Sequence, residues 1–157
     1  MSLSKIQTLD RIRVPLRATD KVAAITELVD VLDAAGAVDD RDETLREMLE
    51  REERLSTGIG YGLAIPHIKS GRCKDLVIAA GKPAQPVDFQ SIDGRPVTFV
   101  VLLVSPFAQV AAYQEAMAQL ASLMNVQEFR AAVEQARTAQ ELHALIVAYE
   151  RGGRDAR

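Results

Sequence analysis

The sequence predicts an α/β domain in which helices cover a central sheet. Residues 97–104 form a nearly unbroken apolar run rich in β-branched side chains, which is typical of a strand buried on both faces. Before this run, residues 25–32 carry apolar side chains at the i, i+3, i+4 and i+7 spacing of an amphipathic helix. After it, residues 108–124 and 138–149 also show helical patterns. Helices before and after a group of strands predict a sheet flanked by helices.

Two helices are expected in the first third of the chain. Thr19 or Asp20 caps the first helix, and Gly36 stops it. The second helix runs approximately over residues 41–53 and is crowded with charge, so we expect it on the surface of the domain. Arg51 falls near its C-terminal end. Only three apolar residues mark its inward face: Leu45, Met48 and Leu49.

The middle of the chain is strand-like. Residues 76–80 are apolar, and a proline-flanked stretch that follows contains Val87 and Phe89. Asp93 and Gly94 then form a turn signal just before the long apolar run. These segments are therefore expected to contribute to the sheet.

The last part of the chain is expected to be helical up to a tail. A short helix is predicted at about residues 129–136. The helix over residues 138–149 begins at a capping box formed by Thr138 and Glu141. Residues 150–157 are polar and contain two glycines, so we expect a flexible C-terminal tail.

Composition limits the class of protein. A chain of 157 residues with 48% hydrophobic residues is typical of one globular domain, which we place at residues 9–149 after an N-terminal tail or tag remnant at residues 1–8. A net charge of −3 and the lack of a mixed basic and aromatic patch argue against nucleic acid as a partner. The longest apolar run is too short to span a bilayer, and the N-terminus lacks a signal-peptide pattern. We therefore expect a cytoplasmic protein without direct membrane insertion.

The most informative segment is residues 56–67, in which a glycine-punctuated apolar stretch ends at a histidine directly after a proline. Three glycines at alternate positions permit close approaches of the backbone that side chains would block. Pro66 has a fixed φ and keeps Ile65 extended. His67 is therefore expected to begin a rigid loop after a strand.

Residues 57–67 read Thr-Gly-Ile-Gly-Tyr-Gly-Leu-Ala-Ile-Pro-His and resemble the active-site signature of the type-2 enzyme IIA domains of the phosphoenolpyruvate-dependent phosphotransferase system, the mannitol, fructose and nitrogen-regulatory family. The resemblance is greatest to the free-standing nitrogen-regulatory proteins. It extends to Arg51-Glu52, to residues 86–96 and to the apolar run ending at Pro106, so that about residues 9–147 fit the family. It implies a single-domain α/β/α sandwich with a mixed sheet flanked by helices.

The resemblance also implies a function. His67 is then the acceptor of a phosphoryl group from the histidine phosphocarrier protein, with Nε2 as the attacking nitrogen and Nδ1 held by a hydrogen bond. Because a neutral imidazole is nucleophilic near neutral pH, histidine suits this role. Phosphoryl transfer also requires positive charge, and Arg51 matches the arginine that the family places beside its histidine. A guanidinium holds two phosphate oxygens at once.

Further phosphate-binding groups are weaker candidates. Ser56 and Thr57 carry hydroxyls close to the signature glycines, whose amides approach anions easily. Lys69 is a candidate for a basic rim, although a solvated side chain is the favoured interpretation. Tyr113 lies where the family commonly has a second histidine. Its phenol is either a donor to a phosphoryl oxygen or part of a helical core face that also contains Ala116, Met117, Leu120 and Met124.

The chain differs from the family at a second position, because Ile68 stands where glycine usually follows the active histidine. A branched side chain there restricts the loop and is expected to shield or crowd the imidazole. His143 has no accompanying ligand or base in the sequence and is interpreted as structural or exposed. Cys73 lies between two basic residues, where a lowered thiol pKa is one interpretation and an incidental thiol is the favoured one.

Two other kinds of site are not supported. The glycine spacing at residues 58–62 lacks the third glycine of a dinucleotide fingerprint and no Gly-Lys-Ser/Thr follows, so nucleotide binding is not expected. Two distant histidines and one cysteine give no metal-ligand spacing. No cofactor and no metal are implied. The expectation is a regulatory phosphocarrier without a fused transporter, with the phosphocarrier protein and possible regulatory proteins as partners; the alternative is a binding module that keeps the fold without phosphotransfer.

Overall fold

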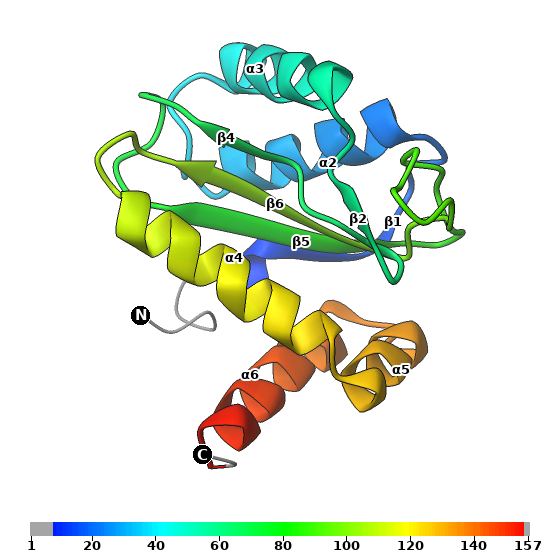
Figure 1. Ribbon diagram of the computed structural model, residues 1–157. Helices are drawn as coiled ribbons and strands as arrows, with labels where there is room; N and C mark the ends of the chain where they lie inside the picture. The colour runs from blue at the N-terminus through cyan, green and yellow to red at the C-terminus, as the bar shows by residue number, and fades with distance from the viewer. Residues whose placement is uncertain (1–7, 156–157) are drawn as a thin grey trace.

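The computed structural model describes residues 8–155, which form a mixed sheet covered on both faces by helices (Figure 1). In chain order the elements are η1 (Leu9–Arg11), β1 (Ile12–Leu16), α2 (Lys21–Ala34), α3 (Arg41–Arg54), β2 (Gly58–Gly60), β3 (Leu63–Ala64), β4 (His67–Lys69), β5 (Val77–Pro83), β6 (Phe99–Ser105), α4 (Val110–Met124), α5 (Gln127–Gln135) and α6 (Ala139–Asp155). The predicted α/β/α sandwich with a mixed sheet is confirmed.

Strand β6 organises the sheet. The strand order is β1-β5-β6-β3-β2, and β4 also pairs with β6. Strand β5 runs antiparallel to β6, whereas β3 and β4 both run parallel to it along its other edge. Every residue of β6 is buried, as its apolar sequence predicts for a strand covered on both faces.

Two core clusters lie on opposite faces of the sheet. One packs α2 and α3 against alternate residues of β5 and β6, such as Ala79 and Leu102. The other packs α4, α5 and α6 against the residues between them, such as Ile78 and Leu103. Because successive strand residues point to opposite faces, one apolar strand supplies both clusters. Figure 1 shows α2 and α3 on one side of the sheet and α4, α5 and α6 on the other.

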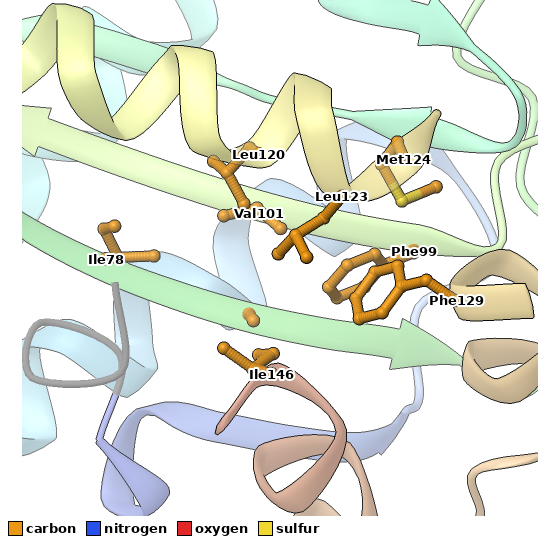
Figure 2. Close-up of a pocket in the computed structure, with 9 residues that line it drawn as sticks. Ile78, Phe99, Val101, Leu120, Leu123, Met124, Phe129 and Ile146 are labelled. Carbon is orange, nitrogen blue, oxygen red and sulfur yellow. The ribbon is translucent and has the colours of Figure 1, made fainter. Parts of the chain in front are cut away.

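The second cluster contains a small apolar cavity between the sheet and helices α4, α5 and α6 (Figure 2). Its lining has no titratable or hydrogen-bonding side chain, and consists of Ile78, Ala80, Phe99, Val101, Leu120, Leu123, Met124, Phe129 and Ile146. Such a lining offers no donor or charge to an anionic group. This cavity is therefore not suited to a charged ligand.

Most predicted helix ends agree with the structure within a few residues. Asp20 is the N-cap of α2 and accepts a hydrogen bond from the amide of Ala23, and Gly36 follows the helix with a φ of 69°. Helix α6 begins where the Glu141 amide donates to the Thr138 hydroxyl oxygen. Its helical backbone continues to Asp155, so it includes most of the segment predicted as a tail. Residues 1–7 and 156–157 lie outside the described residues.

Some strands differ from expectation. The stretch around Val87 contributes only an isolated bridge to Val97, where a strand is predicted. The sequence pattern did not reveal β1, the short strand at the far edge of the sheet. Within residues 8–155, none of the helices is both long and apolar enough to cross a membrane.

Candidate functional site around His67

His67 is the first residue of strand β4, which corrects the expectation that it begins a loop. Strands β3 and β4 lie along one edge of β6 in a single continuous register, with Leu63 opposite Phe99 and His67 opposite Leu103. Ile65 and Pro66 separate β3 from β4 and belong to neither strand. The Pro66 carbonyl accepts from the Leu103 amide, at 2.9 Å, which keeps the register across the interruption.

The interruption orients the imidazole. His67 Nδ1 lies 2.6 Å from the carbonyl oxygen of Ile65. Because a carbonyl oxygen only accepts, Nδ1 carries the proton, and Nε2 holds the free lone pair. This arrangement is the one that nucleophilic attack through Nε2 requires.

The surroundings keep the imidazole neutral. Burial lowers the pKa of His67 from its ordinary value, and the positive charge of Arg51 lowers it further. The hydrogen bond to the Ile65 carbonyl and the negative charge of Glu52 act in the opposite direction without cancelling the shift. The side chain is only partly buried, so a neutral nucleophile is held within reach of solvent.

Arg51 lies in the last turn of α3, the helix that packs beside β4. Its Nη1 donates to the carbonyl oxygen of Leu55, at 2.9 Å, just past the end of the helix. Its positive charge contributes to the lowered pKa of His67, and it opposes the rise that burial causes in the pKa of Tyr113. The structure thus brings the predicted cation and the predicted nucleophile together.

Tyr113 lies in the first turn of α4, and its ring centroid is 5.8 Å from that of His67. Burial raises the pKa of the Tyr113 phenol, so its hydroxyl stays protonated and able to donate. The ring is partly buried against the second core cluster. Both interpretations of the sequence thus describe part of its position, because the ring packs on the core and also faces the histidine.

Lys69 lies on the same face of β4 as His67. His67 and Lys69 are two apart in β4 and project to the same face of the strand. The Lys69 ammonium lies 5.3 Å from the centroid of the Tyr113 ring, within the range of a cation–π contact. Lys69 is exposed, so this cation lies at the rim of the site.

Ile68 points away from the imidazole. It is buried in the cluster between the sheet and helices α2 and α3, on the opposite face of β4 from His67. The side chain therefore fills core space, and the expected crowding of the imidazole is not seen. Cys73 is also buried, and this burial raises the pKa of its thiol to about 11, which removes the interpretation of a reactive thiolate.

The hydroxyls of Ser56 and Thr57 already have partners. Ser56 donates to the carbonyl oxygen of Phe89 and accepts from the amide of Gly58. Thr57 is buried and its hydroxyl donates to Glu52 Oε2, at 2.6 Å. Both residues lie next to the site, but the structure shows their hydroxyl hydrogens directed to protein oxygens.

Two charged neighbours of the site, Glu52 and Lys21, have no role assigned to them from the sequence. Glu52 is buried and its Oε1 lies 3.1 Å from the Nζ of Lys21, a residue at the start of α2. A signal was available, because Glu52 lies four residues after Met48 on the inward face of the second helix. A carboxylate on a buried face requires a partner.

The glycine-rich segment forms a hairpin. Strand β2 runs antiparallel to β3, and the turn between them contains Tyr61 and Gly62 with φ values of 57° and 79°. No helix follows this turn, so the segment lacks the helix N-terminus that a nucleotide-binding loop uses.

Comparison with known proteins identifies the family. Residues 5–149 match the model of the phosphoenolpyruvate-dependent sugar phosphotransferase system EIIA 2 family. The chain belongs to this family. As an EIIA domain it is a phosphotransferase component, and these findings favour that activity over a binding module without phosphotransfer.

Individual relatives carry sugar-related and regulatory names. The EIIA domain is 32% identical to a fructose-specific EIIA component of Haloferax volcanii (92% of this chain, 96% of the relative) and 29% identical to a nitrogen regulatory protein of Bradyrhizobium diazoefficiens (93% and 95%). It is 34% identical to part of the fructose-specific EIIABC component of Bacillus subtilis, covering 83% of this chain but only 20% of that protein. The crystal structure of the nitrogen regulatory protein IIA-Ntr from Neisseria meningitidis has the same fold, with a TM-score of 0.84 at 24% identity over 92% of this chain and 98% of that chain.

Proposed function

We propose that Nε2 of His67 accepts a phosphoryl group from the phosphorylated histidine of the histidine phosphocarrier protein. The N–P bond of the donor breaks as the N–P bond to Nε2 forms, and Nδ1 keeps its proton throughout. The observation that carries this proposal is the hydrogen bond from Nδ1 to the Ile65 carbonyl, which leaves Nε2 as the free nucleophilic nitrogen.

The neighbours of His67 suit the transferred group. Arg51 supplies the charge that stabilises the equatorial oxygens, and the protonated phenol of Tyr113 supplies a donor. Ser56 and Thr57 remain weaker predictions as phosphate ligands, because their hydroxyl hydrogens are directed elsewhere.

The proposed role is regulatory and cytoplasmic, of the nitrogen type. The similarity to a nitrogen regulatory protein over nearly its whole length supports this role. Phosphorylation adds roughly two negative charges at one surface, which changes the affinity of any protein that docks there. The proposed partners are the histidine phosphocarrier protein and regulatory target proteins. Transfer from the phosphorylated protein to a fructose-type EIIB domain would instead support a role in sugar uptake.

The test is the intact mass after incubation with phosphoenolpyruvate, enzyme I and the phosphocarrier protein. We expect one acid-labile phosphoryl group on the wild-type chain and on His143→Ala, a matched control that removes the other histidine. His67→Ala should gain none. An unmodified wild-type chain, with a known acceptor labelled in the same tube, would overturn the proposal.

A further inference from the structure

The buried carboxylate of Glu52 lies close enough to the proposed phosphoryl site for its charge to act on His67. The Glu52 side chain is 4% exposed, and that of Lys21, its ion-pair partner, is 17% exposed. Glu52 does not face solvent, and it is the residue after Arg51. A charge held this deep in a protein requires several hydrogen bonds, and those of Glu52 all lead to defined partners.

Both carboxylate oxygens of Glu52 bind Thr57. Oε1 accepts from the Thr57 amide at 3.0 Å, and Oε2 accepts from the Thr57 hydroxyl at 2.6 Å. This two-point contact joins the last turn of α3 to the residue that precedes β2. The contact spans the short connection between α3 and β2. In the same connection, the carbonyl oxygen of Leu55 accepts a hydrogen bond from the guanidinium of Arg51.

The contact continues to the histidine through the backbone. The carbonyl of Thr57 accepts from the amide of Ile65 at 3.0 Å, and the carbonyl of Ile65 accepts from Nδ1 of His67. One unbroken series of hydrogen bonds therefore links Glu52, Thr57, Ile65 and His67 in that order. We name it the hydrogen-bond path. One end adjoins Arg51 in sequence, and the other end is the nucleophile.

We infer that Glu52 and Thr57 are positioning residues, which hold the Arg51 guanidinium in register with Nε2 of His67 through the hydrogen-bond path. The inference rests on the proposed function, and it gives Thr57 a role different from contact with phosphate. Lys21 neutralises the carboxylate, and its Nζ also binds Gln90 Oε1 at 3.0 Å, which anchors the start of α2 to the same place.

The test compares phosphorylation rates of Thr57→Val, Thr57→Ser and Glu52→Gln, with Glu53→Gln as a matched control on the exposed neighbour. Displacing a positioned cation by a fraction of an ångström is expected to slow transfer by about tenfold to a hundredfold in Thr57→Val and Glu52→Gln. The loss should lie in the maximal rate, with the half-saturating concentration of phosphocarrier protein nearly unchanged. Thr57→Ser keeps the hydroxyl and should restore the rate, and Glu53→Gln should match the wild type.

A double-mutant cycle separates positioning from simple structural damage. If Thr57 acts through Arg51, then Thr57→Val should cost little more in an Arg51→Gln background than Arg51→Gln costs alone. Additive losses, or a wild-type rate in both Thr57→Val and Glu52→Gln, would overturn the inference while leaving phosphorylation of His67 intact.

A second readout does not require phosphorylation. The charged groups that act on His67 are Arg51 and Glu52 from α3. The neutral Tyr113 ring from α4 lies beside the imidazole, and Lys69, on the same strand as His67, contacts that ring. By NMR titration, Arg51→Gln should raise the pKa of His67, because a lowering charge is lost, and Thr57→Val should reproduce part of that rise. An unchanged pKa in Thr57→Val would count against the inference even if the wild-type chain takes no phosphoryl group.

Discussion

At the scale of single residues, the two nitrogens of His67 have separate tasks. One is fixed by a main-chain carbonyl and the other is left to react. The sequence signature predicts which histidine matters and that Arg51 belongs with it. It does not predict the partner of Nδ1, because that partner depends on an interruption between two short strands.

The pH dependence of phosphorylation follows from this environment. The lowered pKa of His67 keeps Nε2 unprotonated to a pH below the ordinary value of 6.5. The initial rate should therefore stay level from neutral pH down to 6.5 and fall only on further acidification. Initial rates measured across pH 5 to 8 with a pre-phosphorylated carrier give the profile, and a midpoint above 6.5 would contradict the burial argument.

The same shift has a consequence for stability. The folded state binds fewer protons at His67 than the unfolded state between its lowered pKa and about 6.5. The contribution of His67 to the free energy of unfolding should therefore decline as pH falls through this window and should be constant above it. Urea denaturation of the wild type and of His67→Ala at several pH values isolates this contribution.

The two interpretations of Tyr113 make different predictions. If the phenol donates to the transferred group, Tyr113→Phe should slow phosphorylation by roughly a hundredfold to a thousandfold, as loss of one preorganised donor does in other enzymes. The ring and its contact with Lys69 stay in place in this variant. A core tyrosine without a role in transfer predicts an unchanged rate, and Lys69→Gln shows separately whether the rim cation contributes.

At the scale of elements, the buried pair of Lys21 and Glu52 joins α2 to α3. Replacing Lys21 with Met leaves the Glu52 carboxylate buried without its cation. This change should lower the free energy of unfolding by about 3–5 kcal/mol, because an uncompensated buried charge is costly. Chemical denaturation measures the loss, and the double variant Lys21→Met, Glu52→Gln should recover part of it. Equal losses in the single and double variants would contradict this account.

The turn between β2 and β3 requires glycine at position 62. Its φ is 79°, and a Cβ atom would lie 2.8 Å from Oγ1 of Thr98. Gly62→Ala should therefore cost about 1–3 kcal/mol of stability. Gly71→Ala is the matched control, because a Cβ there meets nothing within 4 Å and its φ is not positive. Equal denaturation midpoints for the two variants would refute the argument.

Elements with strong local periodicity are predictable from this sequence. The second helix is expected at residues 41–53 and is found at Arg41–Arg54, because its cap and its inward face are both local signals. The short strands β2, β3 and β4 are not predictable in the same way. The pairing of β3 and β4 with β6 joins residues 36 positions apart, as Leu63 and Phe99 show, and no local pattern specifies such a register.

At the scale of the whole molecule, the two core clusters share β6, which is also the strand beside His67. The composition predicts one globular domain, and the long apolar run predicts its central strand. The site was only partly predictable for a physical reason. The family resemblance includes Arg51, Glu52 and His67, but it gives no role to Glu52. The partners of Glu52 are visible only in the folded chain, because one of them, Lys21, lies 31 positions earlier.

The break between β3 and β4 makes the orientation of His67 insensitive to a change of side chain at position 65. The acceptor for Nδ1 is the carbonyl of Ile65, a group that every amino acid carries. Exchanging the side chain at position 65 therefore leaves the tautomer of the imidazole unchanged as long as the strand keeps its path. Sequences can diverge at this position without losing the nucleophile, which a side-chain acceptor in the same place would not allow.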